Sequence, residues 1–225
     1  MSIIHEQRLS DSPYVEAVTY GRTMSEGSTI RPAESNWHMV FVKEHGRSHS
    51  LVVGPLTMAG VAAWGEGAEI LWVKFKLGVF MPYLPVRELL DSEKSLPEAS
   101  GKSFWLKNAA WEKPDFENVD TFVNKLMRDE ILVFDPVVNA MLQDQLPDMP
   151  SRTMRHHFLR ATGLTQSRIR QMKRAQQATT LLKQGVSILD AVHELGYFDQ
   201  PHLNRALRQF IGYTPAQIAQ LNQSE

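Results

Sequence analysis

The feature that most constrains this chain is an internal repeat in its last third, where the second copy follows the first at an offset of 49 residues. Each copy places four side chains at i, i+3, i+4 and i+7, which are Met154, His157, Phe158 and Ala161 in the first copy and Leu203, Ala206, Leu207 and Phe210 in the second. The same offset aligns 163–166 with 212–215. This spacing predicts two helices that each bury one stripe, and therefore two copies of one helical unit.

A second, shorter helix is predicted just before the second copy of the stripe. Ser187 followed by Asp190 is similar to a capping box, which starts a helix. Gly196 then supplies a tight turn, and Asp199 can cap a helix that begins at Gln200. Two helices joined by a short Gly-containing turn form a helix-turn-helix.

The face opposite each buried stripe is predicted to be exposed, and it carries polar and basic side chains. Arginine, asparagine and glutamine on such a helix read base edges in the major groove of DNA. Candidate base-reading residues are Arg152, Arg155, His156, Gln200, Asn204 and Arg205. A long helix over 166–183 joins the two units, and the candidate phosphate contacts are Arg170, Lys173, Arg174 and Arg208. His157 lies on the buried face, where we expect it to pack.

The distribution of charge agrees with a polyanionic partner for the last third. Residues 1–149 carry 14 Lys+Arg and 21 Asp+Glu, a net of −7, whereas residues 150–225 carry 10 and 4, a net of +6. A basic segment of this kind favours a nucleic-acid partner.

The first half of the chain is predicted to be rich in β-strands. Runs of β-branched and aromatic residues cover 14–20, 37–42, 51–53 and 70–77, and Gly and Pro separate them. The pattern changes at 112–118, after which an apolar stripe over 119–127 predicts an amphipathic helix and Asp135-Pro136 predicts another helix start. We therefore expect an α+β protein with a small β-barrel or jelly-roll-like domain over 1–114 and an all-α domain over 115–225.

The helical part resembles the DNA-binding domain of AraC/XylS-type transcriptional regulators over about residues 135–221. The matching residues are Phe158, Gly163, Arg174, Ala178, Leu181-Leu182, Ser187-Ile188, Gly196-Tyr197, Asp199, Leu203, Arg205, Leu207 and Gly212-Tyr213-Thr214-Pro215. Two stretches of the sequence depart from that pattern. Pro150 replaces the usual serine before the first recognition helix, and Pro201-His202-Leu203 replaces the usual Ser-aromatic-Phe of the second.

The resemblance implies a sequence-specific regulator that binds double-stranded DNA. Val53-Gly54-Pro55 is similar to an element of the cupin-like domains that precede this DNA-binding domain in some relatives. Such domains bind small effectors or dimerise, so a homodimer, an effector and RNA polymerase are candidate partners. Trp37, Trp64 and Trp72 are candidates for an effector pocket, and core packing is the alternative role. The alternative function is a cupin-type enzyme or small-molecule-binding module with a helical interaction tail.

Several other classes are excluded or disfavoured by the composition. The chain has no cysteine, which excludes disulfide frameworks, thiolate zinc sites and cysteine nucleophiles. His38, His45 and His49 do not supply a convergent ligand set, and no catalytic motif stands out, so we expect no metal, no cofactor and no enzyme. The N-terminus lacks a signal-peptide pattern, and Gly and Pro interrupt the longest uncharged stretch, over 50–65. A soluble, cytoplasmic protein without a membrane span is expected.

Overall fold

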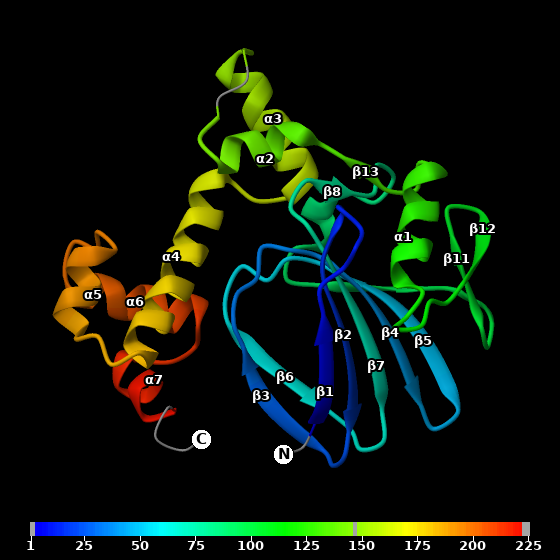
Figure 1. The fold of residues 1–225 in the computed structure, drawn as a ribbon, viewed down its shortest axis with the longest axis horizontal. Helices are drawn as coiled ribbons and strands as arrows, with labels where there is room; N and C mark the ends of the chain where they lie inside the picture. The colour runs from blue at the N-terminus through cyan, green and yellow to red at the C-terminus, as the bar shows by residue number, and fades with distance from the viewer. Residues whose placement is uncertain (1–2, 146–147, 222–225) are drawn as a thin grey trace. The chain divides into compact units, whose positions relative to one another are not determined.

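The computed structural model describes residues 3–145 and 148–221, and they form two compact units (Figure 1). The first unit comprises Met1–Ser28, Asn36–Pro55 and Ala63–Thr165. The second comprises Thr29–Ser35, Leu56–Ala62 and Gln166–Glu225. Two short segments from the β-rich half therefore belong to the same unit as the last helices. The boundary near residue 114 stays a prediction.

The first unit is built on a six-stranded antiparallel sheet. Its strands, in spatial order, are β1 (Ile3–Arg8), β2 (Val15–Thr23), β7 (Glu69–Phe75), β4 (His38–Glu44), β5 (Arg47–Val53) and β9 (Glu93–Leu96). The four runs read from the sequence correspond to β2, β4, β5 and β7. Side chains alternate between the two faces along β7, where Leu71, Val73 and Phe75 are buried.

Smaller β elements, which the sequence pattern did not predict, accompany this sheet. They are the meander β10 (Glu98–Ser100), β11 (Ser103–Leu106) and β12 (Ala109–Glu112), the pair β8 (Val79–Phe80) and β13 (Val133–Phe134), and the pair β3 (Gly27–Arg31) and β6 (Gly60–Trp64). A short 3-10 helix, η1, follows β8 at Val86–Leu89. These strands are two to five residues long, too short for a period-2 pattern to stand out.

Helix α1 (Val119–Arg128) packs on this unit through the apolar stripe that the sequence predicted. Val119, Phe122, Val123 and Leu126 are buried. The ring of Phe122 lies edge-on to those of Phe41, Phe104 and Trp111, at centroid distances of 6.0 to 6.5 Å. Edge-to-face contacts of this kind add to the burial of apolar area.

The remaining helices follow the predicted order. Helices α2 (Pro136–Leu142) and α3 (Ser151–Thr162) lie in the first unit, and α4 (Gln166–Lys183), α5 (Ile188–Glu194), α6 (Gln200–Phe210) and α7 (Pro215–Leu221) lie in the second. The α+β class is confirmed: a sheet-rich part precedes two helix-turn-helix units joined by a long helix. Within residues 3–145 and 148–221, no helix combines the length and apolar character needed to cross a bilayer.

Candidate nucleic-acid interface

The second helix-turn-helix has the caps that its sequence predicted. The Ser187 hydroxyl accepts the Asp190 N–H at 3.1 Å and lies 2.6 Å from the Asp190 carboxylate. The Asp199 carboxylate accepts the His202 N–H at 2.6 Å. Gly196, between α5 and α6, has φ of +66°, a conformation that glycine adopts without strain. The start of α6 is therefore fixed by local hydrogen bonds.

Helix α6 buries one face and exposes the other, as the repeat predicted. Leu203, Leu207 and Phe210 are buried, and the exposed residues are Gln200, Pro201, Arg205, Arg208 and Gln209. Asn204 differs, because it is half-buried and its Oδ1 lacks a hydrogen-bond partner within the described part of the chain. A buried acceptor without a partner is costly, and this oxygen is not accessible to solvent.

Arg174 of α4 contacts the turn between α5 and α6. Its guanidinium lies 4.4 Å from the centroid of the Tyr197 ring and donates to the Gly196 carbonyl at 3.4 Å. Burial raises the pKa of the Tyr197 hydroxyl. Arg170 and Lys173 are exposed on α4, whereas Arg174 is half-buried. Of the four candidate phosphate contacts, Arg170, Lys173 and Arg208 are thus exposed, and Arg174 also contacts the turn.

Two loops of the β-rich half, one after β3 and one before β6, donate hydrogen bonds to the C-terminal end of α6. The Ala33 N–H donates to the Phe210 carbonyl at 2.6 Å, and the Ala59 N–H donates to the Gln209 carbonyl at 2.8 Å. Arg168 donates to the Thr57 carbonyl at 2.6 Å, with its guanidinium 4.5 Å from the Phe210 ring centroid. All of these residues belong to the second unit. The last carbonyls of α6, which lack partners inside the helix, are satisfied by these loops.

In the first helix-turn-helix, the residue that caps α2 also contacts α3. Asp135 caps α2 by accepting the Val137 N–H at 3.0 Å, and its other carboxylate oxygen lies 2.7 Å from His157 Nδ1 on α3. The expected packing role of His157 is therefore accompanied by a polar contact. Helix α3 ends at Thr162, and its C-cap is Gly163, whose φ is +69°. Residues 146–147, within the α2–α3 connection, lie outside the described residues.

Helix α3, like α6, exposes arginines on the face opposite its buried apolar stripe. Met154, Phe158 and Ala161 are buried. The exposed residues include Arg152, Arg155, His156 and Leu159, the last with 43% of its surface accessible, and also Ser151, Thr153 and Arg160. All three candidate base-reading residues of this helix are thus available to a ligand.

The three tryptophans proposed for an effector pocket lie in different surroundings. Trp37 is buried, stacks on Phe75 with ring centroids 4.1 Å apart, and donates its indole N–H to the Val79 carbonyl at 2.6 Å. Trp64 and Trp72 are half-buried. An effector role for the three stays a prediction, but Trp37 is held as a core side chain.

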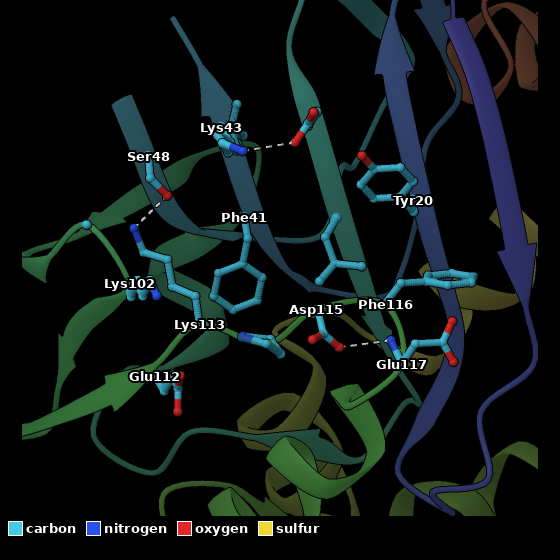
Figure 2. Close-up of a pocket in the computed structure, with 15 residues that line it drawn as sticks. Tyr20, Phe41, Lys43, Ser48, Lys102, Glu112, Lys113, Asp115, Phe116 and Glu117 are labelled. Atoms are coloured by element: carbon cyan, nitrogen blue, oxygen red, sulfur yellow. Dashed lines mark hydrogen bonds and ion pairs between the residues drawn. The ribbon is translucent and has the colours of Figure 1, made fainter. Parts of the chain in front are cut away.

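A cavity of about 580 Å³ lies elsewhere in the first unit (Figure 2). Phe41 and Leu71 from two neighbouring strands line it together with Phe116, which comes from the segment before α1. Lys43 and Glu69 form an ion pair at 3.5 Å beside it. The sequence did not indicate this cavity, because its lining comes from separate strands and one loop. Within the described residues, no three His, Asp or Glu side chains are grouped as metal ligands would be.

Comparison with known proteins supports the helical assignment. Residues 148–220 match a family model described as a helix-turn-helix domain. Matched solved structures include ToxT from Vibrio cholerae O395, at 8% identity and a TM-score of 0.41, covering 100% of this chain and 99% of that chain. A second is ToxT from Vibrio cholerae O395 bound to (E)-4-(8-methylnaphthalen-1-yl)but-3-enoic acid, at 9% identity and a TM-score of 0.40, covering 99% and 100%. No curated protein matches the sequence. The domain match confirms the helix-turn-helix assignment made from the 49-residue repeat.

Proposed function

We propose that this chain, a DNA-binding transcriptional regulator with a helix-turn-helix domain of the AraC type, reads two successive major-groove segments with α3 and α6. The observation that carries the proposal is the matched exposure of the two helices. Each buries its apolar stripe and presents arginines outward, Arg152 and Arg155 on α3 and Arg205 on α6. An α-helix has the width of the major groove, and arginine pairs with guanine through two hydrogen bonds.

The basic residues divide into two proposed roles. The base-reading role goes to Arg152, Arg155, His156, Gln200, Asn204 and Arg205, because asparagine, glutamine and arginine side chains pair with base edges. The phosphate-binding role goes to Arg170, Lys173, Arg174 and Arg208. Phosphate contacts fix the position of a protein on DNA, and base contacts give its specificity.

Control of DNA binding is proposed to act through the two loops at the end of α6. The segments 29–35 and 56–62 contain the end of β3 and the start of β6, so these strands are joined in sequence to the loops that bond the end of α6. An effector could use this route only if it bound the two arrangements with different affinity. A homodimer and RNA polymerase remain proposed partners.

The cavity of the first unit is the proposed effector site. Its volume of about 580 Å³ lies within the usual range for small-molecule sites, about 300–1,000 Å³. Apolar side chains line part of the cavity, and charged residues of both signs line the rest, which suits a small molecule that carries apolar and polar groups. These charged residues are Lys43, Glu69, Lys102, Glu112, Lys113, Asp115 and Glu117. The test is a thermal-shift screen of the full chain, with each hit repeated on Lys43→Glu. A ligand that stabilises both proteins equally would bind elsewhere.

The experiment that tests the main proposal starts from random DNA. The full chain selects duplexes from a random library, and mobility shifts against competitor DNA compare a selected duplex with a random one. We expect a selected duplex to bind at least 10³-fold more tightly, the lower end of specific recognition. A cupin-type enzyme or binding module with a helical tail would select no sequence.

A further inference from the structure

A hollow of about 340 Å³ lies beside the outward face of α3, within the first unit. One side is formed by His156, Leu159 and Arg160 of α3. The other side comes from the β-rich half, from the segment that runs from β8 into η1, and its lining residues are Phe80, Met81, Pro82, Pro85 and Arg87. The face of α3 assigned to DNA is therefore continuous with a surface outside the helix-turn-helix.

The charged side chains that line this hollow are all basic. Arg87 and Arg160 are both exposed, and none of the described residues that line the hollow is acidic. This contrasts with the net charge of −7 over residues 1–149. A basic edge on an otherwise acidic part of the chain favours an anionic ligand at this place.

The two sides of the hollow are held close together. The guanidinium of Arg160 lies 5.3 Å from the centroid of the Phe80 ring. Gly163, at the end of α3, approaches η1 so closely that a Cβ there would lie 3.1 Å from the backbone N of Arg87 and the carbonyl carbon of Val86. A side chain at position 163 would press on the η1 backbone, so α3 and η1 are closely packed and Arg87 lies beside α3.

We propose that Arg87 and Arg160 bind the phosphates that flank the groove segment read by α3, so that the β-rich half contributes directly to the DNA interface. The inference rests on the proposed function, because α3 must enter the groove for Arg87 to reach the backbone. A helix about 10–12 Å across fills a groove about 12 Å wide, so basic side chains at its flank meet phosphates rather than bases. Arginine binds phosphate oxygens with two parallel hydrogen bonds.

The test compares Arg87→Gln in the full chain with the wild type and with Arg47→Gln. Arg47 is an exposed arginine of the same unit, at the start of β5, so its removal changes the net charge equally. The probes are a duplex selected by the wild type from a random library and a random duplex of the same length. Affinity is measured at several salt concentrations, and thermal unfolding of each variant checks its folding.

We expect Arg87→Gln to weaken binding to both duplexes by a similar factor. Loss of one phosphate contact reduces the slope of log affinity against log salt by about 0.9. The fall in affinity between 50 and 200 mM salt should therefore be about 3.5-fold smaller than for the wild type. Arg47→Gln should keep the wild-type slope, and Arg160→Gln should lower it as Arg87→Gln does.

Three results would overturn the inference while leaving the proposed function intact. One is an Arg87→Gln slope equal to that of the wild type. Another is an equal loss in Arg47→Gln, which would indicate a general charge effect. The third is tighter binding by Arg87→Gln, which would indicate that the β8–η1 segment obstructs α3. Failure of the wild type to prefer any duplex would instead contradict the proposed function itself.

Discussion

The backbone N–H of Ala59 donates to the carbonyl of Gln209 at 2.8 Å, so a loop from the β-rich half ends the second recognition helix. The Ala33 N–H makes the neighbouring bond to Phe210 at 2.6 Å. Carbonyls in the last turn of a helix have no partner within it, and here the partners lie far away in sequence. The second recognition helix is thus completed by the part of the chain that the sequence assigned to a separate domain.

Gly212 is the residue that most directly tests this arrangement. Its φ is +86°, and a Cβ there would lie 2.5 Å from Ile30 Cγ2 and 3.2 Å from Ala59 Cβ. Gly212→Ala should displace the loops and destabilise the full chain. Gly185→Ala is the matched control, since φ is +84° there and no atom lies within 4 Å of the added Cβ.

Both glycine substitutions carry the strain of a left-handed residue, about 1–2 kcal/mol. Gly212→Ala should cost more than that, because overpacking adds about 1–3 kcal/mol. Urea unfolding of the two variants measures the difference. Equal losses of stability would show that the loops do not press against the end of α6.

Arg205 and Arg208 are both exposed on α6, and their proposed roles predict different losses. Arg205→Ala should cost about 1–3 kcal/mol on a selected duplex and little on random DNA. Arg208→Ala should weaken both duplexes alike and reduce the salt slope by about one unit. Competition binding at two salt concentrations separates the two patterns. If Arg205→Ala weakened binding to both duplexes equally, Arg205 would be a phosphate contact and not a base-reading residue.

Arg174 and Lys173 are adjacent on α4 but differ in what they contact. Arg174 lies over Tyr197 and donates to Gly196, whereas Lys173 is exposed. Arg174→Gln should lower both the thermal stability of the chain and its affinity for any DNA. Lys173→Gln should lower the affinity alone. Unchanged stability in Arg174→Gln would mean that its contact with the turn contributes nothing.

The stability of the first unit is expected to depend on pH through the ionisation of Asp120, on α1. Burial alone would raise its pKa, but hydrogen bonds from Ser10 and Arg8 and the charge of Arg8 outweigh burial and lower the pKa below its usual value. A lowered pKa in the folded state adds stability above the unfolded pKa of about 3.9, and this stability disappears as the pH falls through the folded value.

Asp120→Asn should therefore be less stable than the wild type at pH 7, with the difference shrinking below about pH 4. Urea unfolding at several pH values measures this. A stability difference that stays constant from pH 7 down to pH 3 would show that ionisation of Asp120 contributes no stability.

The helices were predictable from the sequence because their signals are local. The stripe that includes Leu203 and Leu207 repeats every three or four residues, and Asp199 and Ser187 lie next to the helix ends that they cap. The contact of Ala59 with Gln209 has no such signal, since a backbone N–H leaves no trace in residue type. The 580 Å³ cavity was missed for a similar reason, because strand register brings Phe41 and Leu71 together.

The measurement that tests the account most directly is a hydroxyl-radical footprint of the full chain on a duplex that it has selected. Two recognition helices in one chain predict two protected groove segments on one face of the duplex, about 34 Å or one helical turn apart. Arg152→Ala with Arg155→Ala should weaken one segment, and Arg205→Ala the other. A single protected segment in the wild type, or protection without sequence preference, would contradict the reading of DNA by both α3 and α6.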